Sequence, residues 1–273
     1  MQKKVVAIHD ISGLGKCSLT VAIPILSALK VQCCPFPTAV LSNQSEYPKY
    51  SFCDLTCEMK NYSNVWGELG FEFDSIYTGF LGSKEQVDIV LDFINVHKDS
   101  FIVVDPVMGD DGLMYTCFDE AMRAELKKLV SFSDMTTPNL TEALYLVGDS
   151  YENLDLSDSE ILNVAKRVSI LGPDKVIITG IKSGNCIYNL SYDATENEHY
   201  FSGKPFNGRS YSGTGDIFSS IVCGMLCRGF DFDISVNTAS EFISKAIEYT
   251  SGFETDRNDG VMFEEFLGDL TSL

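Results

Sequence analysis

Short apolar runs alternate with longer runs of helical periodicity along this chain, and this alternation restricts the fold more than any other feature. Residues 5–8 and 101–104 have the length and composition of buried strands, whereas residues 84–96 place apolar side chains three and four positions apart. Strands that alternate with helices are typical of parallel sheets with helices on both faces. The pattern predicts an α/β fold, a three-layer αβα sandwich with a mainly parallel central sheet.

The predicted elements follow from the same periodicities. We expect strands at residues 5–8, 33–41, 75–78, 101–104, 135–136 and 175–179, then an antiparallel pair at 186–192 and 199–201. We expect helices at residues 17–29, 84–96, 120–130, 140–147, 158–171, 217–227, 234–250 and 263–270. Segment 33–41 carries two prolines, so part of it should lie at a sheet edge. Residues 42–64 are expected to be irregular, and we predict one domain over residues 1–273.

Charge and cysteine content restrict the class of function. The formal net charge of −19 disfavours binding to nucleic acids and to anionic membranes. No apolar run is long enough to span a membrane, and the apolar run at the N-terminus is too short for a signal peptide. The nine cysteines show no paired C-x-x-C spacing, which argues against a zinc site and for reduced thiols. We therefore expect a cytoplasmic protein.

Polar and glycine residues follow the predicted strands. They are Asp10, Ser12, Gly79, Asp105, Asn139, Thr179, Gly180 and the loop 213–216. In open α/β sheets, ligands bind at the carboxyl ends of the strands. We therefore expect these residues to gather around one site.

The loop from Tyr211 to Asp216, with the sequence YSGTGD, precedes a strongly apolar helical run. Its two glycines let backbone N–H groups turn towards one point, and the helix dipole adds positive potential there, so the loop predicts an anion site. Asp216 has two interpretations. It is an acid favoured by the dipole in a first helical turn, or it takes a proton from a nucleophile that attacks a bound phosphate.

The loop after the first strand is not a Walker phosphate loop, because Asp10 and Cys17 stand where glycine and serine or threonine are required. Asp10 and Ser12 either cap the next helix or hydrogen-bond a small polar substrate. Residues 42–47 are polar and aromatic. If they fold over a substrate, Ser45 and Tyr47 supply a donor and a stacking face.

Two acidic motifs, residues 105–110 and 138–142, also follow predicted strands. Asp105 and Asp110 are either acceptors in a turn or contacts to Mg²⁺ and nucleotide phosphates. Asn139 with Glu142 has the pattern of a capping box, and the same carboxylate can also face a metal. Cys117, farther along, is either a small hydrophobic residue, which we favour, or a lid thiol that reaches an aldehyde.

Hydrolase chemistry is disfavoured. The three histidines, His9, His97 and His199, show no triad spacing, and the chain has no G-x-S-x-G motif.

In their order, these motifs are similar to those of the ribokinase-like superfamily, and within it to the kinases of vitamin B6 (pyridoxal, pyridoxine and pyridoxamine kinases). The blocks D-x-S-G, S-N-x-S-x-Y, D-P-V-M-G-D, T-P-N-x-x-E, T-G and G-T-G-D lie between residue 5 and about residue 228, which is most of the chain. The D-P-V-M-G-D and G-T-G-D blocks carry the likeness to the superfamily. The S-N block carries the likeness to the B6 branch.

The resemblance implies a role for each matched residue. Asp216 would be the base that deprotonates a 5′-hydroxyl, and the amides of Gly213, Thr214 and Gly215 would form the anion hole. The implied substrate contacts are Asp10, Ser12, Ser42, Asn43, Ser45, Tyr47 and Phe80. The implied nucleotide contacts are Asp105, Tyr115, Asn139, Thr179, Gly180 and Lys182, and the implied metal contacts are Asp105, Asp110 and Glu142. ATP and Mg²⁺ would be cofactors, a monovalent cation such as K⁺ stays open, and a homodimer is expected.

Three departures from the B6 pattern bear on the substrate. The loop 10–15 is shorter than in many B6 kinases and is more similar to that of the hydroxymethylpyrimidine kinases of thiamine synthesis. Phe80 stands where B6 kinases often carry tyrosine. Gln44 and Ser45 replace the commoner histidine and threonine.

The leading hypothesis is therefore an ATP- and Mg²⁺-dependent kinase that phosphorylates the 5′-hydroxymethyl group of a B6 vitamer. The alternative is a hydroxymethylpyrimidine kinase, with the same chemistry on another ring. A sugar kinase ranks third, because the N-terminus has no sugar-recognition block rich in glycine, asparagine and aspartate. A protein of another class would bind nucleotide or B6 without catalysis, but the intact Asp216 loop argues against it, since a binding protein needs no base.

Overall fold

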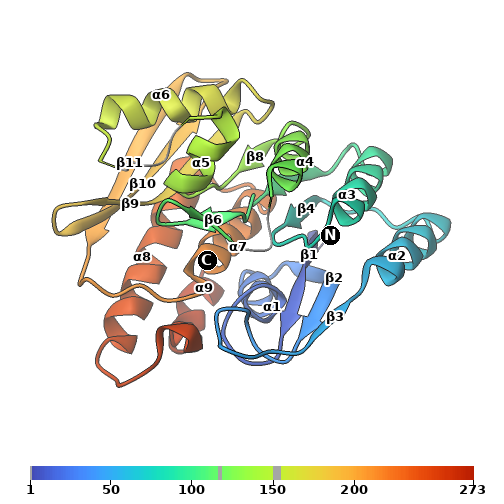
Figure 1. The fold of residues 1–273 in the computed structure, drawn as a ribbon, viewed down its shortest axis with the longest axis horizontal. Helices are drawn as coiled ribbons and strands as arrows, with labels where there is room; N and C mark the ends of the chain where they lie inside the picture. The colour runs from blue at the N-terminus through green and yellow to red at the C-terminus, as the bar shows by residue number, and fades with distance from the viewer. Residues whose placement is uncertain (1, 116–118, 150–154) are drawn as a thin grey trace.

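One sheet runs through the middle of the molecule (Figure 1). Within residues 2–115, 119–149 and 155–273, which the computed structural model describes, it has nine strands in the order β11-β10-β9-β8-β5-β4-β1-β2-β3. Strands β2, β1, β4, β5, β8 and β9 run parallel to one another, whereas β3, β10 and β11 pair antiparallel. The strands are β1 (Lys4–Ser12), β2 (Gln32–Leu41), β3 (Phe52–Asp54), β4 (Ser75–Thr78), β5 (Phe101–Val104), β8 (Met135–Thr136), β9 (Lys175–Ser183), β10 (Cys186–Asp193) and β11 (Glu198–Pro205).

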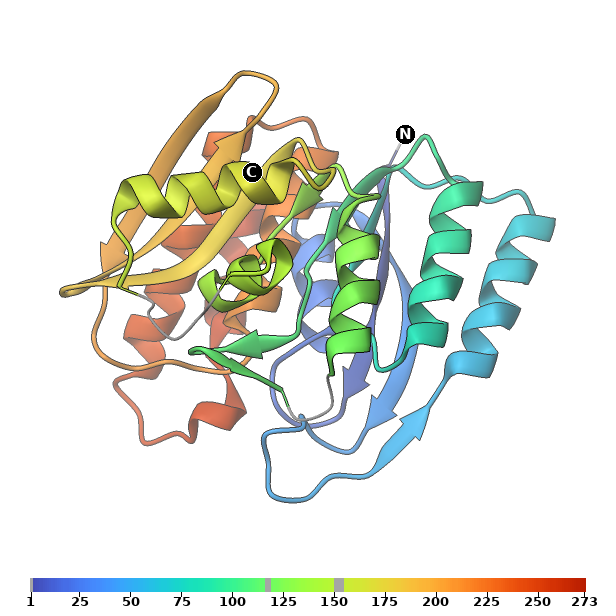
Figure 2. The ribbon, with the colours of Figure 1, turned by 45° about the horizontal axis from the view of Figure 1, so that its top comes forward.

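Helices cover both faces of this sheet, which confirms the predicted three layers (Figures 1 and 2). On one face lie α1 (Leu19–Ala28), α7 (Thr214–Cys227), α8 (Phe232–Thr250) and α9 (Leu267–Thr271). On the other lie α2 (Thr56–Glu68), α3 (Lys84–Val96), α4 (Glu120–Val130), α5 (Leu140–Val147) and α6 (Asp158–Ser169). Short 3₁₀ turns at Arg257–Asp259 and Phe263–Phe266 connect α8 to α9.

Strand β1 shows why both faces are covered. Val5 and Ala7 are buried under the α1 and α7 side, and Val6 and Ile8 are buried under the α2 and α3 side. A strand that is apolar on both sides must be buried on both sides, as in parallel sheets. Helix α7 occupies the centre of its layer, between α1 and α8 (Figure 1).

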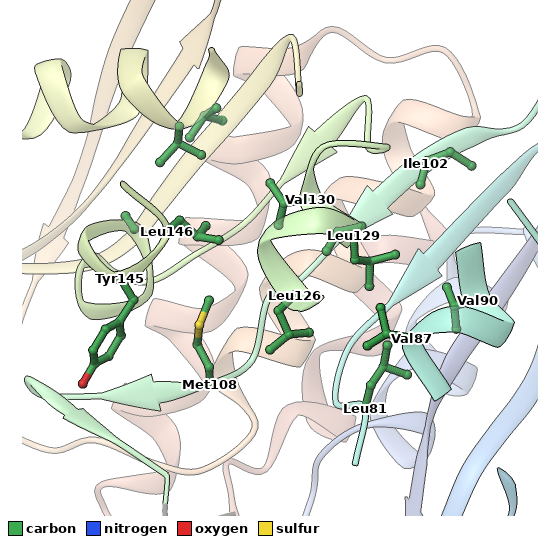
Figure 3. Close-up of a cluster of buried hydrophobic side chains, with 14 of the residues drawn as sticks. Leu81, Val87, Val90, Ile102, Met108, Leu126, Leu129, Val130, Tyr145 and Leu146 are labelled. Atoms are coloured by element: carbon green, nitrogen blue, oxygen red, sulfur yellow. The ribbon is translucent and has the colours of Figure 1, made fainter. Parts of the chain in front are cut away.

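The loop after β5 is anchored in the core by Met108. This side chain is fully buried among residues of α4 and α5, and Figure 3 shows it between Leu126 and Tyr145. Burying a methionine contributes roughly 1.5–3 kcal/mol. The anchor fixes the start of a small hairpin, β6 (Gly109–Asp110) and β7 (Leu113–Met114), at the carboxyl edge of the sheet.

The prediction that residues 42–64 are irregular was wrong for part of this range. Residues from Phe52 onward form β3 and then α2. Met59, Tyr62 and Trp66 have helical spacing, and the rings of Tyr62 and Trp66 pack on Phe36 at centroid distances of 5.4 Å and 5.6 Å. The helix was missed because its apolar stripe is narrow and most other positions are polar and face solvent.

Two strand predictions have different outcomes. The edge prediction for β2 is confirmed, because β3 pairs only with Ala39–Leu41 and leaves the segment with the prolines at the free edge. The predicted end of β9 near Gly180 was wrong. The hairpin with β10 carries β9 on to Ser183, and Gly180 lies at an irregularity in that pairing with a φ of +71°. No helix among the described residues is both long and apolar enough to cross a membrane.

Candidate active site

The carboxyl ends of β1, β5 and β8 meet the N-termini of α5 and α7. The arrowheads of β1 and β2 in Figure 2 point to the edge where the loop after β2 and the β6–β7 hairpin also lie. The carboxylates of Asp105, Glu142 and Asp216 are near enough to interact, since the charges of Glu142 and Asp216 both raise the pKa of Asp105. This edge therefore carries a buried acidic centre.

Helix α7 begins directly after Gly213, which no other residue can replace without strain. Gly213 has a φ of +78°, and a Cβ placed on it would lie 1.7 Å from the carbonyl oxygen of Lys16. The close approach brings the loop after β1 against the start of α7. Asp216 then falls in the first turn of α7.

Among the described residues, Asp216 has one hydrogen-bond donor on one carboxylate oxygen and none at bonding distance on the other. The backbone N–H of Ser18 donates to Oδ2 at 2.9 Å, and Oδ1 lies 3.9 Å from Nδ1 of His9. The side chain is 15% exposed. Burial, followed by the negative charge of Asp10, raises the pKa of Asp216 to about 7. The carboxylate can therefore both hold and release a proton near neutral pH.

Asp10 is held by two serine hydroxyls. Ser12 Oγ donates to its Oδ2 at 2.9 Å, and Ser18 Oγ donates to its Oδ1 at 2.6 Å. Ser18 thus contacts both Asp10 and Asp216, and its φ of +53° is unusual for a residue with a Cβ. Such a conformation costs about 1–3 kcal/mol and persists where the surroundings impose it.

The capping interpretation of Asp10 and Ser12 was wrong. The N-cap of α1 is Ser18, whose side chain makes no cap hydrogen bond because its hydroxyl is bound to Asp10. Both Asp10 and Ser12 are buried at the carboxyl end of β1, where the pairing with β2 is irregular. A substrate would meet the Ser12 hydroxyl only as an acceptor while that hydroxyl donates to Asp10.

Glu142 confirms the predicted capping box. Its Oε2 accepts from the Asn139 N–H at 2.9 Å, and Asn139 Oδ1 accepts from the Glu142 N–H at 2.9 Å. Its Oε1 accepts from the N–H of Met108 at 3.0 Å. Burial, followed by the charge of Asp110, raises the pKa of Glu142 to about 8 despite these donors. Asn139 also donates to the carbonyl oxygen of Gly109 at 2.7 Å, so the cap ties α5 to the β6–β7 hairpin.

Asp105 is almost completely buried, and the hydrogen bond that its carboxylate accepts is long. Ser219 of α7 donates to its Oδ2 at 3.3 Å. Burial, then the charges of Glu142 and Asp216, raise its pKa well above the usual range. Asp110 is exposed and accepts from the N–H of Asp111. Among the described residues, no three His, Cys, Asp or Glu side chains form a ready metal site.

A divalent cation nevertheless fits the chemistry of this centre. Asp105 and Glu142 are buried carboxylates that repel each other, and a positive charge between them removes that repulsion. Magnesium keeps several waters and needs only one or two carboxylates. The fit therefore rests on Asp105 and Glu142, with Asp110 nearer the surface.

The segment after β2 lies against the loop before α7 and the segment after α8. Gln44 is buried and donates to Ser212 Oγ at 3.4 Å, and Ser212 Oγ donates to Glu46 Oε2 at 3.2 Å. Glu46 also lies 3.7 Å from the guanidinium of Arg257. The hydroxyl of Tyr47 donates to Asp259, which raises the tyrosine pKa to about 12.

The other predicted substrate contacts in this segment are tied up within it. Ser42 Oγ donates to Asn43 Oδ1, and Asn43 donates to the carbonyl oxygen of Lys49. Ser45 is exposed. Phe80 is half-buried after β4, and its carbonyl oxygen accepts from Thr38.

The predicted nucleotide contacts are divided between two places. The backbone of Thr179 forms an isolated parallel β-bridge with Asn139. Thr179 is half-buried, and Gly180 is exposed. Tyr115 is half-buried. Its pKa is raised by burial and then by the charge of Glu142, which shows that it lies near the acidic centre. Lys182 lies outside this centre, paired with Asp111 at 2.7 Å. Cys117 lies outside the described residues.

Sequence reasoning missed a pocket of about 400 Å³ that shares Tyr211 with the loop before α7. It is lined by Arg209, Ser210, Tyr211, Phe253, Glu254, Thr255 and Arg257. The signal was weak, because the arginines lie far apart in the sequence. It also missed Ser18 and His9, which touch or approach Asp216 but belong to no recognised motif.

Comparison with known proteins places the chain in a family. A family model described as phosphomethylpyrimidine kinase matches residues 26–262. A hydroxymethylpyrimidine/phosphomethylpyrimidine kinase of Haemophilus influenzae is 32% identical over 183 residues, which are 66% of this chain and 66% of that protein.

Two solved structures resemble the fold over nearly its whole length. A protein of Bacteroides thetaiotaomicron, provisionally described as a phosphomethylpyrimidine kinase and crystallised with pyridoxal, is 42% identical with a TM-score of 0.95, covering 99% of this chain and 96% of its own. The pyridoxal kinase of Lactobacillus plantarum is 26% identical with a TM-score of 0.91, covering 100% and 98%. The chain therefore belongs to the phosphomethylpyrimidine kinase family, among the ribokinase-like kinases that act on vitamin B6 or hydroxymethylpyrimidine.

Proposed function

We propose that this kinase transfers the γ-phosphoryl group of ATP to the 5′-hydroxymethyl group of a B6 vitamer (pyridoxal, pyridoxine or pyridoxamine), with Asp216 as the general base. One observation carries the proposal. Asp216 stands in the first turn of α7, no donor in the described part of the chain bonds to its Oδ1, and burial raises its pKa to about 7. A base with that pKa is matched to removing an alcohol proton near neutral pH.

The start of α7 supplies the anion hole. The N-cap Gly213 has no side chain, so it makes no side-chain hydrogen bond to the first N–H groups of the helix. The N–H groups of Gly213, Thr214 and Gly215 are therefore proposed to bind the transferring phosphoryl group. As the hydroxyl oxygen bonds to the γ-phosphorus and the bond to the β-phosphate oxygen breaks, the hydroxyl proton passes to Asp216.

The remaining phosphates and the metal are assigned to the α5 side of the site. Asp105 and Glu142, with Asp110, would hold Mg²⁺, which when bound neutralises phosphate charge. Asn139 and Thr179 lie together there and would face the phosphates, with Gly180, Lys182 and Tyr115 farther out. The adenosine end is proposed to enter the pocket beside Tyr211, where Arg209 and Arg257 offer charge and Phe253 offers a stacking face.

The substrate ring is assigned to the space between the end of β1 and the segment after β2. Asp10, Ser12, Ser45, Tyr47 and Phe80 surround it in the proposal, with Ser42 and Asn43 shaping the segment. A B6 ring is favoured because a solved relative at 42% identity was crystallised with pyridoxal. Hydroxymethylpyrimidine is the second candidate, because the family model and the Haemophilus influenzae relative carry that name.

A direct assay decides between the rings. ATP consumption should be measured side by side with pyridoxal, pyridoxine, pyridoxamine and hydroxymethylpyrimidine. We expect the highest kcat/KM with a B6 vitamer. A higher value with hydroxymethylpyrimidine would transfer the assignment to that substrate, and turnover of none of the four would overturn the proposed function. The homodimer that the resemblance implies and the expected cytoplasmic location are part of the same proposal, and size-exclusion chromatography with light scattering tests the dimer.

A further inference from the structure

His9 is a buried polar side chain near Asp216 to which the proposed reaction assigns no role. It is the residue of β1 before Asp10 and is fully buried. Neither ring nitrogen has a hydrogen-bond partner among the described residues. Its Nδ1 lies 3.9 Å from Oδ1 of Asp216, the carboxylate oxygen that the Ser18 N–H does not occupy.

The surroundings hold this imidazole in one place. The ring of Tyr77 meets it edge to face at a centroid distance of 4.3 Å. A Cβ on Gly79 would lie 2.3 Å from its Nδ1, so only glycine at that position leaves room for the ring. Burial keeps the imidazole neutral, with a pKa of about 3. A neutral imidazole has one N–H donor and one acceptor nitrogen.

An unsatisfied polar group of this kind is costly. Native structures contain few buried polar atoms without a partner, because such an atom loses its hydrogen bonds to water and gains none in return. Hydrogen bonds at catalytic groups are often long without substrate and shorten in the reacting complex. A shift of about 1 Å would bring Nδ1 and Oδ1 to the usual hydrogen-bond distance of about 2.9 Å.

We propose that His9 is a positioning residue for Asp216, a role that rests on Asp216 being the base. In the reacting complex its Nδ1–H donates to Oδ1 while the Ser18 N–H donates to Oδ2. The two donors fix the plane of the carboxylate, so that a remaining lone pair faces the substrate hydroxyl. His9 itself keeps its proton throughout, and the proton of the alcohol goes to Asp216.

Charged and titratable groups face this pair from every neighbouring element. Asp10 follows on β1, Asp105 follows β5, Tyr77 lies on β4, and Cys17 precedes α1. The single His9 variants leave all of these residues, and the charge of Asp216, in place. A change in the pH profile after substitution of His9 is therefore assigned to the contact with Asp216.

Two amide substitutions test the role while leaving a polar side chain at the site. The amide of His9→Asn reaches the position of Nδ1, whereas that of His9→Gln reaches the position of Nε2. We expect the Asn variant to keep kcat within about threefold and the Gln variant to lose about 10- to 100-fold with little change in KM, as for a displacement of about 1 Å. Equal kcat values for the two variants would overturn the proposal.

His9→Leu adds a readout that a purely structural role would not move. Loss of a donor to the carboxylate raises the pKa of Asp216, so the acid limb of the kcat–pH profile should move to higher pH. An unmoved limb contradicts the proposal. In an Asp216→Asn background, His9→Leu should have no further effect on kcat. Full activity of Asp216→Asn alone would instead refute the base, which separates that failure from failure of the His9 role.

Discussion

Glu142 and Asp216 occupy equivalent places in two helices and have different surroundings. Each lies in the first turn of a helix at the carboxyl edge of the sheet. Burial raises the pKa of Glu142 to about 8 and that of Asp216 to about 7. The Glu142 carboxylate accepts from the N–H groups of Asn139 and Met108 at 3.0 Å or less. Asp216 accepts from one N–H group, that of Ser18.

The two N-caps differ in the same way. Asn139 caps α5 with its side chain. Its Oδ1 accepts from the Glu142 N–H, and the Glu142 carboxylate accepts from the Asn139 N–H, so these N–H groups are already hydrogen-bonded. Gly213 caps α7 without a side chain, so the first N–H groups of α7 are left for a ligand. A helix end with its own acceptors stabilises the fold. A helix end without them, next to a carboxylate with a free oxygen, is suited to phosphoryl transfer.

Asp216→Asn gives the largest expected effect. The amide keeps the shape of the side chain but cannot take a proton, so kcat should fall by about 10²–10⁴-fold. ATP affinity, measured by calorimetry, and the unfolding midpoint should stay close to those of the unchanged protein. Retention of most of the turnover would show that the free oxygen of Asp216 is not the proton acceptor.

Glu142→Ala should lower stability, which Asp216→Asn should not, and turnover should fall as well because Glu142 is proposed to hold Mg²⁺. The substitution removes the acceptor of three backbone N–H groups, those of Met108, Gly109 and Asn139, and opens the capping box, which should lower the free energy of unfolding by about 2–4 kcal/mol. Urea denaturation measures the loss. Glu142→Gln is the control, because its amide oxygen can still accept backbone N–H groups at one of the two carboxylate positions, and it should lose less. An unchanged free energy of unfolding in Glu142→Ala would contradict the stabilising role of the capping box.

Gly213→Ala tests the contact that brings the two halves of the Asp216 site together. Gly208→Ala is its matched control, because Gly208 has a φ of +81° but open space around its Cβ position. Both variants carry the cost of a positive φ, about 1 kcal/mol. The Gly213 variant also collides with the Lys16 carbonyl, so its unfolding midpoint and kcat should fall further than those of the control. Equal losses would mean that the loop after β1 moves aside freely.

The pH dependence of kcat/KM should show the proton of Asp216. The base acts only when ionised, so activity should rise with pH through an apparent pKa near 7 and fall about tenfold per pH unit below it. The free energy of unfolding should change with pH in the opposite direction to the activity. The folded chain holds this proton to higher pH than the unfolded chain, so the stability from the protonated group is complete below about pH 4 and is lost as pH rises through about 7. An acid limb near pH 4 would contradict a buried base.

The sequence predicted the fold well because the signals that define it are local. The apolar strands, the crossover helices and the capping box of Asn139 and Glu142 depend on residues a few positions apart. The roles of Ser18 and His9 were not predictable, since each depends on a contact with Asp216 across about two hundred positions. The sequence left Asp216 with two interpretations for the same reason. Only the arrangement in space shows that one of its oxygens has no donor at bonding distance within residues 2–115, 119–149 and 155–273.

Lys182→Ala gives the smallest expected effect. The Lys182–Asp111 pair joins β9 to the β6–β7 hairpin, on the Glu142 side of the site, and both side chains are about half exposed or more. Exposed ion pairs contribute about 0–1 kcal/mol, so the unfolding midpoint should hardly change. If Lys182 contacts nucleotide phosphates, the KM for ATP should rise about threefold, which corresponds to a loss of roughly 0.7 kcal/mol. The rise should be smaller at high salt, because screening weakens exposed charges.

Asp111→Ala separates the role of Lys182 in the ion pair from a role at the phosphates. This variant breaks the same pair but leaves the lysine free for the phosphates, so its KM for ATP should not rise. An equal rise of KM in both variants would assign the effect to the hairpin.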